Sequence, residues 1–347
     1  MPERATAFAP GRVNLIGEHT DYNEGLALPF AIESGVTVTA WRTGEDSVHV
    51  LALDLEAHDT FTLAGPSPAK GWRAFARGLT AELTRGGATL CGARLEVSGS
   101  VPRGSGLSSS AALEVALSLA LLAVADAPVP DRLELARICS RVENEWVGAQ
   151  TGLLDQMASL YGQRDAAVQI DFRSLEVVPV PLQLGDYTLV TLDSGQRHSN
   201  AGDDAESGYN QRRDECARAC ELLGVRSLRD ASPEQARSLP EPLDRRVRHV
   251  IEENDRVRAA VAALAAGDLQ RVGALLNASH ASLRDGYEIS TPAVEDAVGR
   301  LRDAGAVGAR IMGGGFGGHV LGLLAPGCRA PDGAVAVSPG DGARLVR

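Results

Sequence analysis

The chain has 347 residues, more than one average domain needs and enough for two compact ones. Its composition, 44% hydrophobic and 23% charged, is that of an ordinary folded protein, with no segment biased enough to suggest disorder. The formal net charge of −11 argues against nucleic acids and anionic membranes as partners, because both require a basic surface.

The apolar segments and the cysteines predict a cytoplasmic protein without a membrane span. The longest apolar run, residues 111–125, contains Glu114 and Ser118. It is shorter than the roughly 20 residues that cross a bilayer, so it predicts a buried helix. The N-terminal residues lack the basic stub and apolar core of a signal peptide. Five widely spread cysteines, an odd number, indicate reduced thiols.

The first half alternates strand-like and helix-like segments. β-Branched and apolar residues predict strands over 26–32, 35–43, 46–54 and 92–101. Helices are expected over 72–86, from about residue 107, and after "PVPD". In that last helix Asp131 and Glu134 form a capping box. Its apolar stripe consists of Leu135, Ile138, Cys139, Val142 and Trp146.

The second half is mainly helical, and we expect a domain boundary near Leu182. This division gives two domains, residues 1–182 and 183–347. Helices are predicted over 209–223, 243–266, 268–279 and 292–304. Gly267 suits the position after a helix, and Thr291-Pro292 suits an N-cap and first turn. A strand, a glycine loop over 313–318 and a second strand follow, which makes the chain a mixed α+β protein.

The segment "VPRGSGLSSSAALEVA", which lies between a strand and an apolar helix, suits a phosphate site. Its glycines allow close approach of a ligand, and the helix N-terminus offers unpaired amides to an anion. Ser108, Ser109 and Ser110 add hydroxyls for phosphate oxygens or magnesium. A glycine turn with serine caps is the simpler alternative. A dinucleotide fingerprint fits less well, because Ser109 stands where the third glycine belongs.

The only lysine, Lys70, has no glycine-rich loop before it, so the Walker pattern is absent. Phosphate binding would therefore depend on backbone amides and arginines.

Three motifs resemble one family. "GRVNLIGEHTDYNEG" (11–25) resembles the galactokinase signature, whereas "GSGLSSSAA" (104–112) and "MGGGFGG" (312–318) resemble motifs of the wider GHMP kinase superfamily. "ENEWVGAQTGLLDQMASLYG", "SGYNQRRDEC", "RHVIEENDRV" and "SHASLRDGYEIS" are similar to further galactokinase segments in the same order. The resemblance covers nearly the whole chain, and its first motif is specific to galactokinases and close sugar kinases.

The resemblance implies a two-domain α+β GHMP kinase fold. An N-terminal mixed-sheet nucleotide domain and a C-terminal ferredoxin-like domain would hold the active site between them. The implied reaction is phosphoryl transfer from ATP to the anomeric hydroxyl of galactose, with Mg²⁺ as cofactor, by a monomer. Asp155 and Arg12 would be catalytic; Ser110 and Glu143 would bind the metal. The sugar would contact Glu18, His19, Thr20, Asp21, Gly152 and Tyr209, and ATP would contact Gly104, Ser105, Gly106, Leu107, Ser108, Ser109 and Ser110.

Structural roles are the alternatives for these residues. Arg12 and Glu18 could form a surface ion pair, and Asp155 could be a helix N-cap. Glu143 could be a buried structural carboxylate. His19 could donate within a turn, and Tyr209 could be a core aromatic. Trp72, Trp146 and the methionines are expected in the core without a role in binding.

The chain departs from the family pattern at three places. Acidic residues at Asp203, Asp204 and Glu206 are additional, and they stand in the sequence shortly before Tyr209, which is expected to contact the sugar. The C-terminus is short, which predicts lower stability at the outer edge of the second domain. His319 stands where the family often has Cys.

Competing functions stay open. A kinase for N-acetylgalactosamine or arabinose is the near alternative. A sugar-sensing regulator without catalysis, built on the same fold, is the alternative from another class. A dinucleotide oxidoreductase fits less well, for want of the third glycine and an acidic residue for the ribose.

Overall fold

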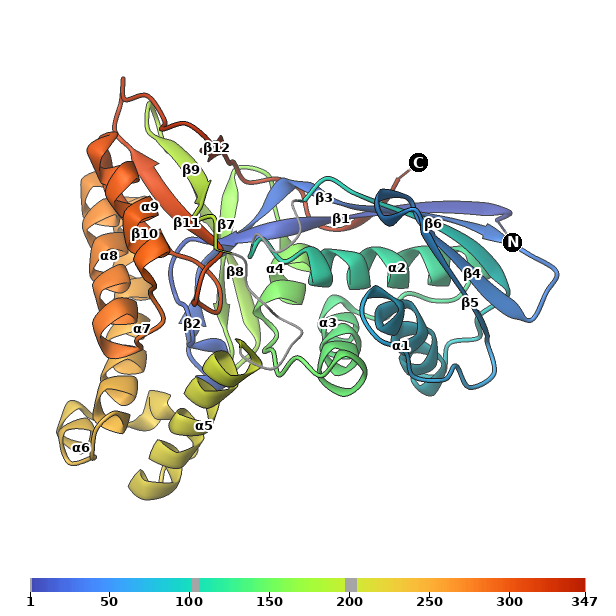
Figure 1. The fold of residues 1–347 in the computed structure, drawn as a ribbon, viewed down its shortest axis with the longest axis horizontal. Coiled ribbons are helices and arrows are strands. Elements are labelled where there is room, and N and C mark those ends of the chain that lie inside the picture. The colour runs from blue at the N-terminus through green and yellow to red at the C-terminus, as the bar shows by residue number, and fades with distance from the viewer. Residues whose placement is uncertain (1, 102–105, 197–204, 347) are drawn as a thin grey trace.

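The structure is a computed structural model that describes residues 2–101, 106–196 and 205–346. Figure 1 shows an elongated molecule in which the first half forms one lobe and most of the second half forms the other. None of the helices in these ranges is long and apolar enough to cross a membrane.

A six-stranded sheet organises the first lobe. Its spatial order is β13 (Arg344–Val346), β1 (Arg4–Asn14), β3 (Pro29–Arg42), β6 (Ala93–Gly99), β4 (Ser47–Ala52) and β5 (Ala57–Thr62). All neighbours are antiparallel except β4 and β6, so the sheet is mixed. The strands expected over 26–32 and 35–43 largely merge into β3, which is 14 residues long.

The helices on one face of this sheet are α1 (Trp72–Arg85), α2 (Ser109–Ala125), α3 (Arg132–Arg141) and α4 (Leu154–Tyr161). Helices α2 and α4 lie directly against the sheet, and α1 and α3 pack on the same side (Figure 1). The apolar run of α2 is buried as expected, and residues such as Leu117 and Leu121 pack in the core against the sheet. Asp131 caps α3 by accepting a hydrogen bond from Glu134 N. The apolar stripe expected to continue as one helix instead passes from α3 into a π-helical turn at Val142–Val147.

A three-stranded sheet joins the two lobes. It contains β2 (Leu26–Ala27), β7 (Ala166–Asp171) and β8 (Glu176–Pro181). The core beside it contains residues from both halves, among them Leu15, Phe30, Val257 and Leu321. The lobes therefore share buried apolar side chains as well as a connection through the chain.

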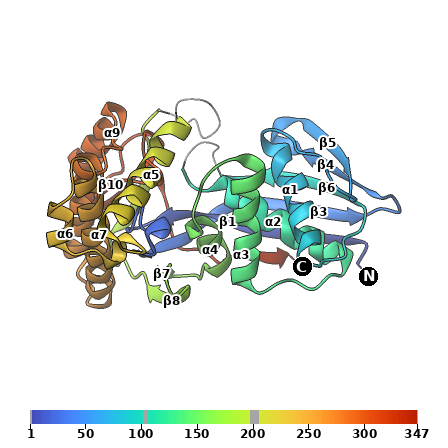
Figure 2. The ribbon, with the colours of Figure 1, turned by 90° about the horizontal axis from the view of Figure 1, so that it is seen from below.

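The second lobe packs helices against a four-stranded sheet with the order β10 (Ala306–Ile311), β11 (His319–Leu324), β9 (Thr188–Asp193) and β12 (Val335–Ala336). Its helices are α5 (Ala205–Leu223), α6 (Pro233–Arg237), α7 (Leu243–Ala265), α8 (Leu269–Ala281) and α9 (Pro292–Asp303). Figure 2 shows α5, α6 and α7 beside one another at the end of the molecule opposite the N-terminus. The expected α+β class is confirmed.

The chain ends on the first lobe. β13 pairs with β1, with Thr6 opposite Val346 and Phe8 opposite Arg344. Ahead of it, Gly342 N donates to Gly162 O. The C-terminal strand therefore extends the sheet of the first lobe. Lower stability at the outer edge of the second domain stays a prediction.

Candidate active site

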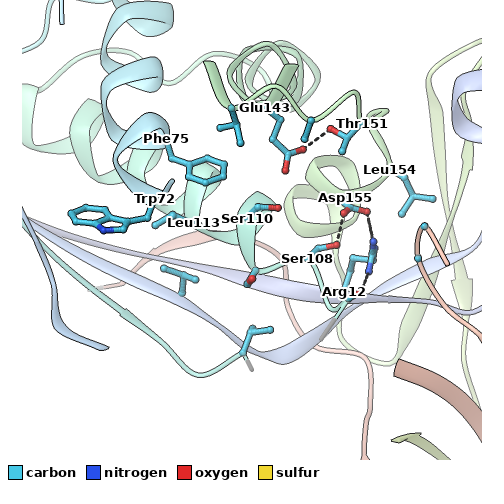
Figure 3. Close-up of a pocket in the computed structure, with 18 of the residues that line it drawn as sticks. Arg12, Trp72, Phe75, Ser108, Ser110, Leu113, Glu143, Thr151, Leu154 and Asp155 are labelled. Carbon is cyan, nitrogen blue, oxygen red and sulfur yellow. Dashed lines mark hydrogen bonds and ion pairs between the residues drawn. The ribbon is translucent and has the colours of Figure 1, made fainter. Parts of the chain in front are cut away.

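A cavity of about 770 Å³ lies where the lobes meet. Figure 3 shows one side of it, where polar groups from β1, α2 and α4 lie beside the apolar side chains of α1. The sequence-predicted residues that line it are Arg12, Glu18, His19, Asp21, Gly106, Ser108, Ser109, Ser110, Glu143, Gly152, Asp155 and Tyr209.

The remaining predicted residues lie elsewhere. Thr20 and Leu107 are buried outside the cavity lining. Gly104, Ser105, Asp203 and Asp204 lie outside the described residues, as does the side chain of Glu206.

Arg12 and Asp155 form an ion pair at the centre of the site. Arg12 Nε donates to Asp155 Oδ1 at 2.7 Å, and Nη2 lies 2.6 Å from the same oxygen. Ser108 Oγ donates to the other oxygen, Oδ2, and Arg12 Nη1 donates to Gly106 O at 2.5 Å. One guanidinium thus joins the acidic group to the start of the serine loop (Figure 3).

The local backbone explains how Arg12 reaches this place. The pairing of β1 with β3 shifts register between Pro10 and Arg12, an irregularity of the kind that re-aims side chains near active sites. Gly11 allows the loop to approach, since a Cβ there would lie 2.5 Å from Leu107 O. Arg12 N then donates to Leu107 O at 3.0 Å.

The structure excludes two of the structural alternatives. Arg12 is buried and pairs with Asp155, so it forms no surface pair with Glu18. Asp155 lies within the first turn of α4, and the N-cap position belongs to Leu153. Its carboxylate is therefore directed to Arg12 and Ser108 rather than to capping.

Glu143 lies in the π-helical turn and is almost fully buried. Its Oε2 accepts hydrogen bonds from Thr151 Oγ1 at 2.6 Å and from Gln156 Nε2 at 2.9 Å. Burial raises its pKa, the nearby Asp155 charge adds to that rise, and hydrogen bonds from Thr151, Ser110 and Gln156 oppose it. The carboxylate and the Ser110 hydroxyl are thus neighbours at the start of α2.

Gln156 joins Glu143 to a second buried carboxyl group. Its Nε2 also donates to Glu114 Oε2 at 3.1 Å. Burial raises the pKa of Glu114 well above its usual value, and the neighbouring Glu143 adds to this rise. The sequence had assigned neither Gln156, in α4, nor Thr151, in the loop before it, to the site, because single uncharged polar residues give no distinctive pattern.

The far end of the cavity is apolar. It is lined by side chains of β4, α1, β6 and α2, namely Val50, Ala52, Trp72, Phe75, Val97, Leu113 and Leu117. Trp72 packs, as expected, against the hydrophobic core between the six-stranded sheet and its helices. It also lines this part of the cavity. The expected core packing of Trp72 is confirmed, and its contact with the cavity is an additional one that the sequence did not predict. An aromatic residue at the start of an amphipathic helix does not show in a single sequence which neighbour it faces.

The signature loop, residues 17–26, carries the other polar groups. Glu18 Oε1 accepts a hydrogen bond from Gly313 N at 2.9 Å and lies 3.3 Å from Arg310 Nη2. The glycine loop at 313–318 thus holds the Glu18 carboxylate of the signature loop. Thr20, expected to bind substrate, instead donates through Oγ1 to Gly17 O and Leu26 O and closes the loop upon itself.

His19 and Tyr209 belong to a ring cluster next to the loop. The ring centroids of His19 lie 5.4 Å from Tyr209 and 4.8 Å from Tyr287. His19 Nδ1 also forms a 2.7 Å hydrogen bond with Tyr22 Oη. Burial, with the nearby cationic groups, lowers the pKa of His19 to about 3, so the imidazole is neutral at neutral pH.

Asp21 faces the cavity against Gly152. A Cβ at position 152 would lie 1.9 Å from Asp21 Oδ2, so only glycine leaves room for the carboxylate there. Burial raises the pKa of Asp21 to about 6. The cavity therefore joins carboxylates suited to hydroxyl groups, a cationic centre at Arg12 and an apolar compartment.

Three family models match the chain. The galactokinase galactose-binding signature covers residues 2–42, the GHMP kinases N terminal domain covers 72–163, and the GHMP kinases C terminal domain covers 260–334. The three segments together include the signature loop, the serine loop with Asp155, and the glycine loop.

Known proteins agree with these models. A galactokinase of Roseiflexus sp. (strain RS-1) is 42% identical over 332 residues, which are 91% of this chain and 82% of that protein. The crystal structure of Lactococcus lactis galactokinase complexed with galactose superposes with a TM-score of 0.91 at 32% identity, over 99% of this chain and 95% of that one. The Methanococcus jannaschii mevalonate kinase, at 17% identity, shares the fold with a TM-score of 0.66 over 97% and 98% of the two chains.

Proposed function

The chain belongs to the galactokinase family of GHMP kinases, and from this we propose that it transfers the γ-phosphoryl group of Mg-ATP to the anomeric hydroxyl of α-D-galactose. The products are galactose 1-phosphate and ADP. The proposal rests on the hydrogen bonds of Asp155, whose carboxylate accepts from Arg12 and from Ser108 of the serine loop. The signature loop lines the same cavity. Cytoplasmic location and a monomeric state stay predictions.

The cavity divides between the two substrates. Galactose lies against the signature loop, where Glu18, His19 and Asp21 face the cavity, and Gly152 and Tyr209 complete its walls. Carboxylates and a neutral imidazole suit a ring of hydroxyl groups. The apolar compartment next to Trp72 and Phe75 takes the nucleotide base, whose flat rings suit apolar and aromatic walls.

The phosphates lie between these compartments, at the N-terminus of α2. Backbone amides at a helix N-terminus attract anions, and the hydroxyls of Ser108, Ser109 and Ser110 lie in the same turn. Arg12, held by Asp155 and Gly106, places its positive charge beside this position.

Phosphoryl transfer passes through a loose transition state, so positioning and positive charge dominate its catalysis. Arg12 neutralises charge that develops on the transferred group. Asp155 accepts or orients the proton of the anomeric hydroxyl, which is worth about a hundredfold or more. Its bonds to Arg12 and Ser108 hold the carboxylate in one orientation while it does so.

A magnesium ion fits the donor atoms present. Ser110 and Glu143 offer a hydroxyl and a carboxylate oxygen, the hard ligands that Mg²⁺ prefers, and phosphates and water would supply the others. Within the described residues no three His, Cys, Asp or Glu side chains form a complete metal site, as is usual for an ion that binds with its nucleotide. When bound, the ion supplies positive charge to the phosphate oxygens.

A coupled assay of ADP release tests the function. The sugars are galactose, glucose, N-acetylgalactosamine, arabinose and galacturonate, with mevalonate as a further acceptor. We expect turnover to prefer galactose. No turnover with any acceptor, in a protein that binds galactose, would instead support the non-catalytic sugar sensor.

Asp155→Ala tests the catalytic assignment. Removing the carboxylate is expected to lower kcat by at least about a hundredfold, because the hydroxyl loses its proton acceptor, while galactose still binds. Asp186→Ala, which changes an exposed aspartate away from the cavity, is the matched control and should leave kcat unchanged. Near-normal turnover in Asp155→Ala would show that another group does this work.

A further inference from the structure

Helix α7 carries buried polar side chains that the reaction does not use. His249, Glu253 and Asn254 are all buried, with Glu253 0% exposed. Residues 249 and 253 are four apart, so they lie on one face of the helix. Burying such groups is unfavourable unless each finds a hydrogen-bond partner. Their partners therefore show what this face of α7 does.

All three side chains bond to the backbone of the signature loop, across the boundary between the two lobes. His249 Nε2 donates to Glu18 O at 3.1 Å. Glu253 Oε1 accepts from Gly17 N at 3.0 Å, and Asn254 Oδ1 accepts from Leu26 N at 2.7 Å. These bonds fix both ends of the loop and its second residue.

The loop needs external support because its backbone is strained. His19 and Glu24, neither of them a glycine, have φ values of 59° and 53°. A left-handed conformation at a non-glycine residue persists where the surroundings hold it in place. From β10, Arg310 adds further support, since its Nη1 donates to Asn14 O and Leu15 O at 2.9 and 3.1 Å.

The surroundings of Glu253 keep its carboxylate ionised, so that it accepts hydrogen bonds. Its Oε1 also accepts from Ser279 Oγ at 2.7 Å, and its Oε2 accepts from Arg256 Nε at 2.6 Å. Burial alone would raise its pKa, but the charges of Arg256 and Arg310 help to lower it to about 2. The carboxylate is therefore ionised at all pH values at which the protein would be assayed.

We propose that His249, Glu253 and Asn254 of α7 are positioning residues for the sugar site. By holding the backbone of residues 17–26, they set the places of Glu18, His19 and Asp21 in the cavity. This inference rests on the proposed function, in that galactose is the ligand of these residues. The second lobe thereby takes part in sugar binding through a helix that does not line the cavity.

The arrangement predicts a selective effect. The apolar compartment is lined by β4, α1, β6 and α2, and none of the lining residues lies on α7. Loss of an α7 contact should therefore weaken galactose binding and leave the KM for Mg-ATP unchanged. A purely structural role would instead lower the amount of active protein without separating the two substrates.

Two substitutions of Glu253 test whether its hydrogen bond to the signature loop supports galactose binding. Glu253→Gln retains an oxygen that can accept from Gly17 N, whereas Glu253→Met has a similar volume and no such acceptor. Both remove the charge that faces Arg256. We expect Glu253→Met to raise the KM and Kd for galactose about fivefold to tenfold, as for loss of one hydrogen bond, and Glu253→Gln to change them less than about twofold.

The control is Asp255→Asn, which changes an exposed carboxylate of α7 that pairs with Arg258 and should leave every constant unchanged. Equal changes in Glu253→Met and Glu253→Gln, or equal rises in the KM for galactose and for Mg-ATP, would overturn the proposal. If Glu253→Met does not fold, Asn254→Ala replaces it, with the same selective rise expected and the same result overturning it. Failure of the proposed function would show separately, as a wild-type protein that does not phosphorylate galactose.

Discussion

At Asp21, the requirements of folding and of binding oppose each other. Burial raises its pKa from 3.8 to about 6, with the charges of Asp155 and Glu18 adding to the rise and Arg213 opposing it. The folded chain thus holds this proton more tightly than the unfolded chain does. Ionisation of Asp21 therefore lowers stability as the pH rises from about 4 to about 6, and the full loss is present above that window.

Asp21→Asn should separate the two requirements. At pH 7 we expect the variant to be more stable than wild type by about 1–3 kcal/mol, and the difference should vanish towards pH 4, where both side chains are neutral. Its KM for galactose should rise at least about tenfold, because a carboxylate accepts hydroxyl protons better than an amide does. Urea unfolding at both pH values measures the first effect and initial rates measure the second.

The control for this prediction is Asp186→Asn, whose exposed side chain lies outside the cavity lining. A stability difference that is the same at pH 4 and pH 7 would contradict the assignment of the effect to ionisation of Asp21.

Sequence reasoning named residues that line the cavity better than the residues that support them. Arg12 and Asp155 are 143 positions apart, so no spacing rule could pair them, and only the resemblance to a family did so. The sequence did not predict roles for Arg310 and Glu253, because charged residues in a strand or a helix usually face water. Their burial follows from contacts between the two lobes, which a linear pattern does not contain.

At the scale of single elements, two helix glycines provide a matched comparison. Gly299 in α9 has open space where a Cβ would stand, whereas a Cβ on Gly273 in α8 would lie 2.7 Å from Val307 Cγ2 and 2.8 Å from the Val307 backbone. Both substitutions to alanine gain the same helix propensity, up to about 1 kcal/mol. Only the second creates a clash.

We therefore expect Gly299→Ala to stabilise the protein by about 0.5–1 kcal/mol, and Gly273→Ala to destabilise it by about 1–3 kcal/mol as α8 is forced away from β10. Thermal unfolding measures both. Gly299→Ala should leave kcat unchanged. A similar Tm change in the two variants would mean that helix propensity outweighs packing at these positions.

The helices were predictable because their periodicity and caps are local. Thr291 and Asp268 cap α9 and α8 by accepting from Val294 N and Arg271 N, and the predicted limits of α7, α8 and α9 are close to the observed ones. The π-helical turn at Val142–Val147 was not predicted, since an extra residue in a helical turn leaves the apolar pattern nearly unchanged. Yet this turn carries Glu143, which lines the cavity.

For the molecule as a whole, the α+β class could be predicted from the sequence, whereas the pairing of distant segments could not. β13 joins β1 across most of the chain, and its three residues carry no signal for that partner. The boundary near Leu182 stays a prediction. The structure shows that apolar residues from both sides of that position share one core, and that the chain crosses back to the first lobe at its end.

This shared core predicts that the two lobes unfold together. The core joins Leu15 and Phe30 to Val257 and Leu321, and α7 adds its hydrogen bonds to the signature loop. The three tryptophans, Trp41, Trp72 and Trp146, all belong to the first half, whereas the two longest helices, α5 and α7, belong to the second. Tryptophan fluorescence and far-UV circular dichroism thus weight different lobes.

In urea, both signals should show one transition with the same midpoint, because neither lobe retains a complete core without the other. Galactose should move both midpoints upwards by the same amount, since a ligand bound to the joined state stabilises the whole cooperative unit. Two separated midpoints would show that the lobes unfold independently. A galactose-induced shift confined to the fluorescence signal would show that the first lobe binds the sugar on its own. The contacts from α7 would then be dispensable for the signature loop.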